Sequence, residues 1–272
     1  LLELKARKLG VPCYELLGGA VRDELELYWS HCGSYRMPTT AHLMGKAPVE
    51  NLDDLVSLGR EVAEQGFDTL KTNIFLFEPD FHMHQPGFAR TDGWPELNPS
   101  PTVITAVRDQ VAALREGAGA DMQILLDLNF NYRTEGFLTV TRALDDLGLA
   151  WYEIDIYDPD ALRRIRDSVR TPIASCESLF GLRGFRPFFE AQAMDVAIVD
   201  VPWNGIWTSR KIAGLAEAHE INVAPHNFYG HLSTMMSAHF CASLPNFRIM
   251  EIDIDDVPWK DDLVTNTPVI VN

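Results

Sequence analysis

Eight short apolar runs recur along the chain, and segments with a helical hydrophobic period lie between them. The runs are rich in Val, Ile, Leu and aromatic residues, and most of them do not alternate cleanly. That pattern is typical of strands buried on both faces of a parallel sheet. The runs cover residues 24–32, 69–75, 123–129, 150–156, 172–178, 196–202, 222–227 and 248–254. Strand–helix alternation repeated this often predicts an α/β fold.

The spacing of the runs separates a closed barrel from an open sheet. From the third run onward, the starts recur about every 25 residues, and eight such units favour a TIM-type (β/α)8 barrel. A doubly wound sheet is the alternative, but no Gly-rich dinucleotide-binding fingerprint follows any of the runs. The longest interruption, residues 76–100, is rich in Pro, aromatic residues and His, and we expect it to be a functional cover.

Composition narrows the possible partners. The chain has 272 residues and a net charge of −16 at pH 7, which argues against nucleic acid or an anionic membrane as a partner. We find neither a run of about 18 apolar residues that would predict a transmembrane helix nor a signal peptide pattern. The four cysteines lack metal-type spacing, which favours reduced thiols and a cytoplasmic location. They are Cys13, Cys32, Cys176 and Cys241.

A charged or titratable residue stands near the C-terminal end of seven of the runs. These residues are Lys71, Asp127, Glu153, Glu177, Asp200, His226 and Glu251. The last six follow one another at intervals of 23 to 26 residues, so each occupies the same place in its unit. In a barrel that place is the catalytic mouth. Packing does not explain the pattern, because unpaired buried charges are costly.

Three of these acids, Asp127, Glu153 and Glu177, come from adjacent runs. Converging carboxylates repel one another unless a cation lies among them. A set of oxygen ligands without His or Cys predicts Mg²⁺, with Mn²⁺ as a possible substitute. The alternative is three solvated acids on separate loops, but their flanking residues are typical of strands.

The next acid and the histidine, Asp200 and His226, end neighbouring runs and can therefore meet. A carboxylate bonded to one imidazole nitrogen fixes the tautomer and raises the basicity of the other nitrogen. We therefore predict that His226 is a general base with Asp200 behind it. Glu251 lies near the same mouth, and in its protonated form, which needs a raised pKa, it could donate a hydrogen bond to an oxyanion.

Ordered motifs over nearly the whole chain resemble the mandelate racemase subgroup of the enolase superfamily. "LKARKLGVPCYELLGG" is similar to the helix that leads into that subgroup's barrel, and "LKTN" stands where the subgroup has K-x-K. "LLDLN", "YEID" and "SCES" are similar to its three acidic ligand motifs. "VDVPWNGIWTSRKIAGLAEAHEINVAPHN" resembles the region that carries its Asp–His pair.

The resemblance implies that Asp127, Glu153 and Glu177 bind Mg²⁺, that Asp200 and His226 form a dyad, and that Glu251 is an electrophile. Members of the subgroup abstract the proton α to a carboxylate and stabilise the resulting enediolate on Mg²⁺, which fits the weak acidity of such a proton. The resemblance also implies a small-molecule acid-sugar substrate and a homo-oligomer.

Several positions depart from the family pattern. Asn73 replaces the second lysine of K-x-K, and Asp155 stands at the usual proline of the fourth-strand motif. The family's N-terminal capping domain is not in the sequence, which begins at Leu1. We therefore expect residues 1–23 to be a helix linking from a missing cap, residues 24–254 to be the catalytic barrel, and residues 255–272 to be a tail returning toward the cap.

Three functions remain open at this level. The first is a lyase activity, in which an aldonate or aldarate is dehydrated to a 2-keto-3-deoxy acid. The second is racemisation or epimerisation of a 2-hydroxy acid, which needs a second base such as Lys71. The third is a barrel that binds acid sugars without catalysis. Other α-proton chemistry, such as cycloisomerisation, is a minor alternative.

We expect further residues of the mouth to bind the substrate. They are Asn73, Asn129, His82, His84 and Trp203. His31, near the end of the first run, faces the mouth only if the strand register allows, and we assign it no role.

Overall fold

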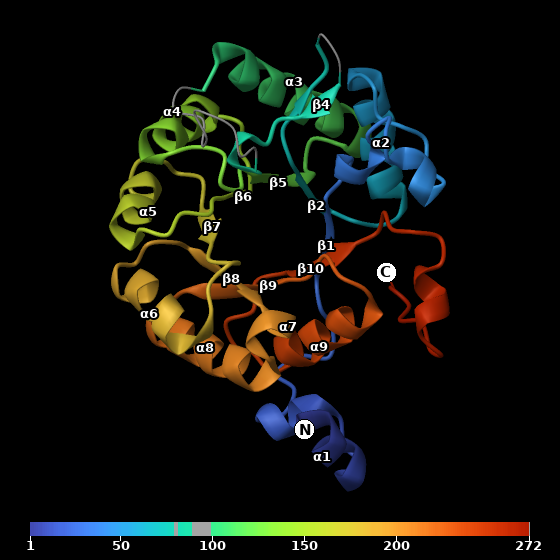
Figure 1. The fold of residues 1–272 in the computed structure, drawn as a ribbon, viewed down its shortest axis with the longest axis vertical. Coiled ribbons are helices and arrows are strands. Elements are labelled where there is room, and N and C mark those ends of the chain that lie inside the picture. Colours follow the sequence, from blue (N-terminus) through green and yellow to red (C-terminus); the bar gives the residue numbers. More distant parts are fainter. Residues whose placement is uncertain (79–80, 89–98, 272) are drawn as a thin grey trace.

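The computed structural model describes residues 1–78, 81–88 and 99–271. Eight parallel strands form one sheet in the order β10-β1-β2-β5-β6-β7-β8-β9, and Figure 1 shows them around a central axis with helices outside. The strands are β1 (Leu27–Ser30), β2 (Thr69–Thr72), β5 (Gln123–Asp127), β6 (Trp151–Glu153), β7 (Ile173–Ser175), β8 (Val196–Asp200), β9 (Asn222–His226) and β10 (Met250–Asp253). The predicted TIM-type barrel is confirmed, and each observed strand lies within one predicted run.

A helix follows each of the first seven barrel strands and returns the chain to the start of the next. These helices are α2 (Leu52–Glu64), α3 (Pro101–Ala118), α4 (Thr134–Leu144), α5 (Pro159–Arg166), α6 (Gly181–Glu190), α8 (Ile206–Ala218) and α9 (His231–Ala242). A short helix, α7 (Val201–Asn204), precedes α8. No helix in the described part of the chain is both long and apolar enough to cross a membrane.

The barrel closes at the seam between β9 and β10. Near the start of β9, Val223 bridges to Phe247, and Val223 donates its N–H to the carbonyl of Asn246 (2.8 Å). At the mouth, Asn227 donates its backbone N–H to Glu251 Oε2 (2.7 Å) and its side-chain amide to the Glu251 carbonyl (3.0 Å). Asn227 therefore both closes the ring and orients a predicted site residue.

Two groups of buried side chains fill the fold. The inner group fills the inside of the barrel. It comprises Tyr28, Leu125, Trp151, Ala174, Val196, Ile198, Ala224 and Ile249. A larger group lies between the strands and the surrounding helices. Alternate residues of a strand point to opposite sides, so β1, β5, β6, β7, β8 and β9 each contribute to both groups. The inner layer is a packed floor, and it confines the polar residues to the mouth above it.

Helices α2 and α3 lie close enough for their backbones to touch. A Cβ added at Gly117 would collide with the Val56 carbonyl, and one added at Gly59 would collide with the Leu114 carbonyl. A side chain at either position would push the helices apart, which is costly in a close-packed interior. This contact fixes the two helices beside β1 and β2.

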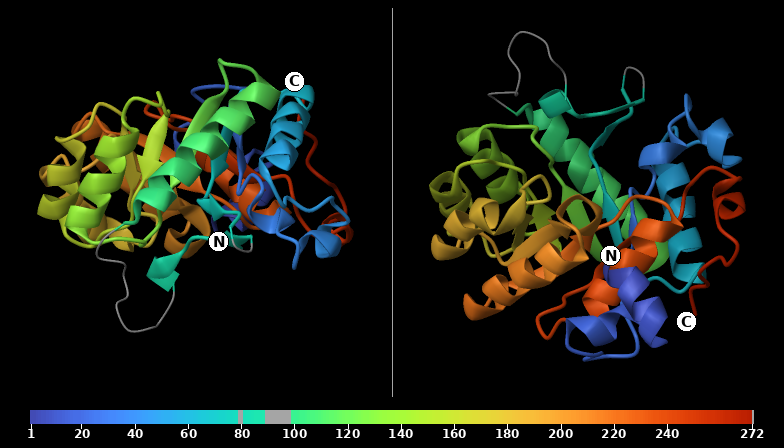
Figure 2. Two further views of the ribbon diagram at one scale, coloured as in Figure 1. Left: turned by 90° about the horizontal axis from the view of Figure 1, so that it is seen from above. Right: turned by 60° about the horizontal axis from the view of Figure 1, so that its bottom comes forward.

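The end segments lie outside the ring of strands. The N-terminal α1 (Leu2–Leu9) and the 3₁₀ turn η1 (Cys13–Leu17) lie by α9 in Figure 1, where Tyr14 contacts the ring of His239 (5.5 Å). The C-terminal tail contains η5 (Lys260–Leu263) and runs beside α2 in both views of Figure 2. The predicted connections of these segments to a capping domain stay predictions.

The remaining short elements belong to the loops after β1 and β2. After β1 come η2 (Ser34–Arg36) and η3 (Ala41–Met44). After β2, the hairpin strands β3 (Phe75–Leu76) and β4 (His82–Met83) pair in antiparallel fashion, and η4 (Pro86–Phe88) follows. The predicted cover, residues 76–100, includes this hairpin strand pair, but residues 79–80 and 89–98 lie outside the described part.

Arg36 ties the loop after β1 to α2 and to the C-terminal tail. Its guanidinium is buried and donates two hydrogen bonds to Asp255 (both 2.8 Å) and two to Glu61 (2.5 and 2.9 Å). The hydrogen bond from Arg36 lowers the pKa of Glu61 below its ordinary value of 4.5, although burial acts against it. The stabilisation from the Arg36–Glu61 ion pair is therefore present at neutral pH, and it is lost as the pH falls through the lowered pKa of Glu61.

Replacing Arg36 should cost much of the free energy of unfolding. Arg36→Leu leaves the fully buried Asp255 without its partner, and removing one member of a buried ion pair costs about 3–5 kcal/mol. Urea unfolding at pH 7 measures this loss. Arg7→Leu is the matched control, because the Arg7–Glu3 pair is exposed and should contribute less than about 1 kcal/mol. Equal unfolding midpoints for the two variants would contradict the assignment.

Candidate active site

Four of the predicted site residues are the last residues of their strands. Asp127 ends β5, Glu153 ends β6, Asp200 ends β8 and His226 ends β9. The register places Asp127 beside Glu153 and Asp200 beside His226. Glu177 lies two residues beyond β7. The barrel thus collects at one mouth residues that are far apart in the sequence.

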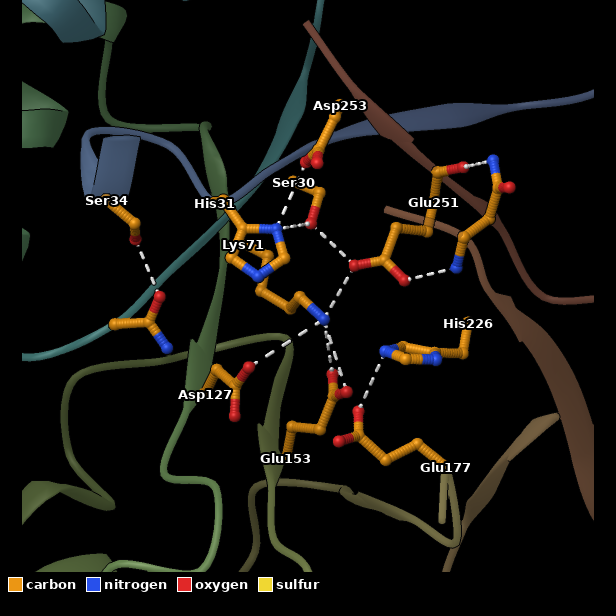
Figure 3. A network of polar contacts seen from close by, with 12 residues as sticks. Ser30, His31, Ser34, Lys71, Asp127, Glu153, Glu177, His226, Glu251 and Asp253 are labelled. Atoms are coloured by element: carbon orange, nitrogen blue, oxygen red, sulfur yellow. Dashed lines mark hydrogen bonds and ion pairs between the residues drawn. The ribbon is translucent and has the colours of Figure 1, made fainter. Parts of the chain in front are cut away.

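The Lys71 side chain is buried at the centre of the mouth, and carboxylates lie around its ammonium group (Figure 3). Its Nζ is 2.7 Å from Glu251 Oε1, 3.2 Å from Glu153 Oε1 and 3.8 Å from Asp127 Oδ2. Burial lowers the pKa of Lys71, but the negative charges of Glu153 and Glu251 outweigh it and raise the pKa well above its ordinary value. The contacts with these carboxylates therefore favour the charged form of Lys71.

The contacts of Glu251 favour its ionised form, so the raised pKa that a protonated Glu251 needs is not found. Its Oε1 accepts a hydrogen bond from Ser30 Oγ (2.5 Å), and its Oε2 accepts the Asn227 N–H (2.7 Å). Burial raises the pKa of Glu251, but Lys71 and the histidines outweigh burial and lower it below its ordinary value. Every contact supplies a donor to the carboxylate, which favours its charged form.

His226 and Asp200 form the predicted dyad. His226 Nδ1 donates to Asp200 Oδ2 (2.8 Å), and the Tyr229 hydroxyl donates to the same oxygen (2.6 Å). The other nitrogen, Nε2, lies 3.3 Å from Glu177 Oε2 (Figure 3). Burial lowers the pKa of His226, but the bond to Asp200 and the charge of Glu177 raise it to about 9. To act as a base, His226 must be neutral. A bound cation would compensate the charge of Glu177, which is one cause of the raised pKa of His226.

Asp155 is a further buried carboxylate at the mouth, and it replaces the usual proline of its motif. When both acids are ionised, neither Asp155 oxygen has a hydrogen-bond donor among the described residues, and Glu177 can share a hydrogen bond with it when one of the two is protonated. Burial and the neighbouring charges of Glu153 and Asp127 raise its pKa well above the ordinary value. The pKa of Glu153 and of Glu177 is raised as well, first by burial. Lys71 therefore supplies too little positive charge for the acids around it.

These residues fit a divalent cation by their chemistry. The set offers oxygen donors only, which suits Mg²⁺ or Mn²⁺, and the two unpartnered oxygens of Asp155 lack the donors that buried polar atoms normally have. As the side chains stand, no three His, Cys, Asp or Glu residues of the described chain surround one ion position. Lys71 and His226 instead hold the carboxylates. The three predicted ligands therefore stay a prediction.

Asn73 and Asn129, predicted to bind the substrate, bond to each other within the mouth. The Asn73 amide donates to Asn129 Oδ1 (3.2 Å), and Asn73 Oδ1 accepts from Ser34 Oγ (2.6 Å). Asn129 has a left-handed backbone (φ 46°), and its N–H donates to Asp127 Oδ1 (2.9 Å). Both asparagines are buried beside the predicted metal ligand Asp127.

The other three predicted binding residues lie at the rim. His82 is exposed on β4, whereas His84 Nε2 is 3.0 Å from the Tyr132 hydroxyl. Trp203 is half-exposed, stacks on Phe180 (5.6 Å), and its ring lies 6.2 Å from the ring of His226. Trp203 walls the dyad, and contact of any of the three with a substrate stays a prediction.

Sequence reasoning missed several residues that the fold brings to the mouth. His31 Nδ1 lies 3.0 Å from Asp253 Oδ1, and Tyr35 and Tyr229 each donate a hydroxyl to a site aspartate. One signal was available, because Asp253 is two residues after Glu251 on β10 and must share its side of the strand. Nothing in the sequence places Tyr35 or Tyr229 against an aspartate.

A known family matches most of the chain. The family described as enolase C-terminal domain-like matches residues 54–272. The chain belongs to this family. The resemblance inferred from the ordered motifs is thereby confirmed.

Members of this family similar to the chain include acid-sugar dehydratases. D-xylonate dehydratase of Haloferax volcanii is 28% identical over 99% of this chain and 61% of its own length. D-gluconate dehydratase of Thermoproteus tenax is 27% identical over 97% of this chain and 48% of its own length. The chain thus spans about half to two thirds of these relatives.

One solved structure is much more similar in sequence. It is a crystal structure from Burkholderia xenovorans strain LB400, provisionally named an L-alanine-DL-glutamate epimerase, bound to magnesium and fumarate. It is 50% identical, with a TM-score of 0.94 over 99% of this chain and 67% of that chain.

Replacing Asp155 should stabilise the metal-free protein. Asp155→Asn removes an uncompensated buried carboxylate, and we expect the free energy of unfolding in EDTA to rise by about 1–3 kcal/mol. The gain in stability on adding Mg²⁺ should shrink, because the site then carries less negative charge. Thermal unfolding with and without Mg²⁺ measures both effects, and Asp121→Asn, an exposed acid, is the control. A destabilised Asp155→Asn with an unchanged Mg²⁺ effect would contradict this account.

Proposed function

We propose that the protein dehydrates an acid sugar, an aldonate or aldarate, to a 2-keto-3-deoxy acid with the help of Mg²⁺. The observation that carries the proposal is the His226–Asp200 pair facing an excess of buried carboxylates. An imidazole that an aspartate holds through one nitrogen can accept a proton at the other. A cluster of carboxylate oxygens suits a cation that binds the carboxylate of the substrate. The names of the similar dehydratases support the same reaction.

His226 acts as the base in this proposal. Its Nδ1–H is held by Asp200, and Tyr229 fixes Asp200 in turn, so Nε2 is the nitrogen that takes the proton α to the carboxylate. Lys71 and Glu251 form a fixed ion pair next to this point. Asp127, Glu153 and Glu177 would hold the cation, with Asp155 beside them. Bound there, Mg²⁺ would supply positive charge against the negative charge that grows on the substrate.

Epimerisation is the second candidate, because the structure with 50% identity carries the name of an epimerase. An epimerase needs a second group that exchanges protons on the other face of the substrate. Lys71 was considered as the second base, but its ion pairs with Glu251 and Glu153 favour its charged form. Asn73 cannot accept a proton. The residues first considered for this role therefore do not support epimerisation.

The base is tested by substitution in D₂O. His226→Asn should lower both α-proton exchange and keto-acid formation by about 10²–10⁴-fold, because one group starts both events. Asp200→Asn should be milder, about 10–100-fold, because it only misorients the imidazole. NMR over a panel of aldonic and aldaric acids measures both rates, and Asp146→Asn, an exposed acid, is the matched control. Wild-type exchange in His226→Asn would reject His226 as the base.

Incubation of one pure epimer with the protein in D₂O distinguishes the two candidate functions. A dehydratase forms the 2-keto-3-deoxy acid and leaves no second epimer. Build-up of the other epimer, deuterated at the α-carbon and without keto acid, would reject dehydration in favour of epimerisation.

A further inference from the structure

The mouth contains a second His–Asp–Tyr arrangement built like the first. His31 Nδ1 donates to Asp253 Oδ1 (3.0 Å), and the Tyr35 hydroxyl donates to Asp253 Oδ2 (3.2 Å). In the first arrangement, Asp200 likewise receives an imidazole N–H and a tyrosine hydroxyl. In both cases the imidazole is held through Nδ1, so Nε2 is the nitrogen left for chemistry.

The second arrangement belongs to the same mouth. Ser30 Oγ lies 2.9 Å from His31 Nδ1 and donates to Glu251 Oε1 (2.5 Å), which links His31 to the ion pair of Lys71. The Phe228 ring contacts both imidazoles, at 5.5 Å from His31 and 4.9 Å from His226. In the view of Figure 3, the two histidines lie on either side of the Lys71 ammonium.

His31 is held rigidly and is still accessible. Its ring stacks on Tyr35 (4.9 Å), and its backbone is left-handed (φ 47°), an uncommon conformation outside glycine that places the side chain at the end of β1. The side chain is 20% exposed, whereas that of Asp253 is 3% exposed. Within the described chain, Nε2 has no hydrogen-bond partner among the contacts of His31.

The surroundings favour the protonated ring. The groups that face His31 are Asp253, Tyr35, Glu251 and Lys71. Burial and Lys71 lower its pKa, but Asp253 and Glu251 outweigh them, and the pKa is raised above its ordinary value of 6.5. Unlike His226, whose Nε2 lies against Glu177, His31 has its Nε2 free to give a proton to a substrate.

We propose that His31 is the general acid of the reaction, giving its Nε2 proton to the departing β-hydroxyl on the side of the mouth opposite His226. This inference rests on the proposed dehydration. Asp253 and Tyr35 are its positioning residues, since they act through His31. Histidine is suited to this work, because the ordinary pKa of an imidazole lies near neutral pH.

The proton balance closes over one turnover. His226 takes the proton from the α-carbon, and the electron pair left behind forms the double bond to the β-carbon. The β-carbon–oxygen bond breaks, and the leaving oxygen takes the His31 proton and departs as water. The enol product becomes the keto acid by exchanging its hydroxyl proton for one at the β-carbon. His226 then releases its extra proton to solvent, and His31 takes one back.

The test separates departure of the leaving group from removal of the α-proton. His31→Asn should lower keto-acid formation by about 10²–10⁴-fold. The α-proton should still be removed by His226, so the unreacted acid should gain deuterium from D₂O. His42→Asn, an exposed histidine in the same loop, is the matched control and should leave both rates unchanged.

A leaving group that needs no proton provides the decisive comparison. The same sugar acid carrying fluorine in place of the β-hydroxyl loses fluoride, so His31→Asn should turn it over within a few-fold of the unaltered protein. His31→Gln, which keeps a hydrogen-bond donor but has no proton to transfer, should behave in the same way. It serves as the second variant if His31→Asn does not fold, and thermal unfolding checks both.

Three outcomes would overturn the proposal. Equal keto-acid formation by His31→Asn and the unaltered protein would remove His31 from the reaction while leaving the dehydration in place. Equal losses with the hydroxy and fluoro acids would give His31 a structural role. If the unaltered protein interconverts epimers without forming keto acid, and His31→Asn stops this, His31 is a second base and both the inference and the proposed dehydration fall.

Discussion

The ion contacts of Lys71 are the constraint on which the rest of the mouth depends. A parallel barrel brings all eight strand ends together, so acids that end neighbouring strands must be buried side by side. Buried charges of one sign are tolerated only if opposite charges compensate them. Lys71 lies against Asp127, Glu153 and Glu251, but Asp155 and Glu177 receive no such contact from it. The architecture therefore holds a deficit of positive charge at one place.

That deficit bears on how an acidic protein can bind an acidic molecule. With a net charge of −16, the surface repels anions at long range, and the one central lysine is already neutralised by its neighbours. The proposed acid-sugar substrate would thus need positive charge beyond that of Lys71. Asp155 points to the same need, because burial and its acidic neighbours disfavour its ionised form, and that form has no donor among the described residues.

The features that could be predicted from the sequence were those that depend on a single short segment of the chain. An apolar run that ends in Asp or His reports both a strand and the residue at its end, so Asp127, Asp200 and His226 could be placed at the mouth. The charge state of Glu251 could not, because it depends on Ser30 and Asn227, which reach it only when β10 pairs with β1 and meets β9. His31 was missed for the same reason, since its partner Asp253 is 222 residues away.

The difference between the two imidazoles matters for the choice between elimination and epimerisation. Both are held through Nδ1 by an aspartate that also binds a tyrosine, so their orientation is alike. Their outer nitrogens differ, because Nε2 of His226 faces Glu177, whereas the ion pair found for His31 in the described part of the chain is at Nδ1. An epimerase must let each group both give and take a proton from carbon. Unequal surroundings instead suit one group that takes a proton and one that gives it, and elimination can use such a pair.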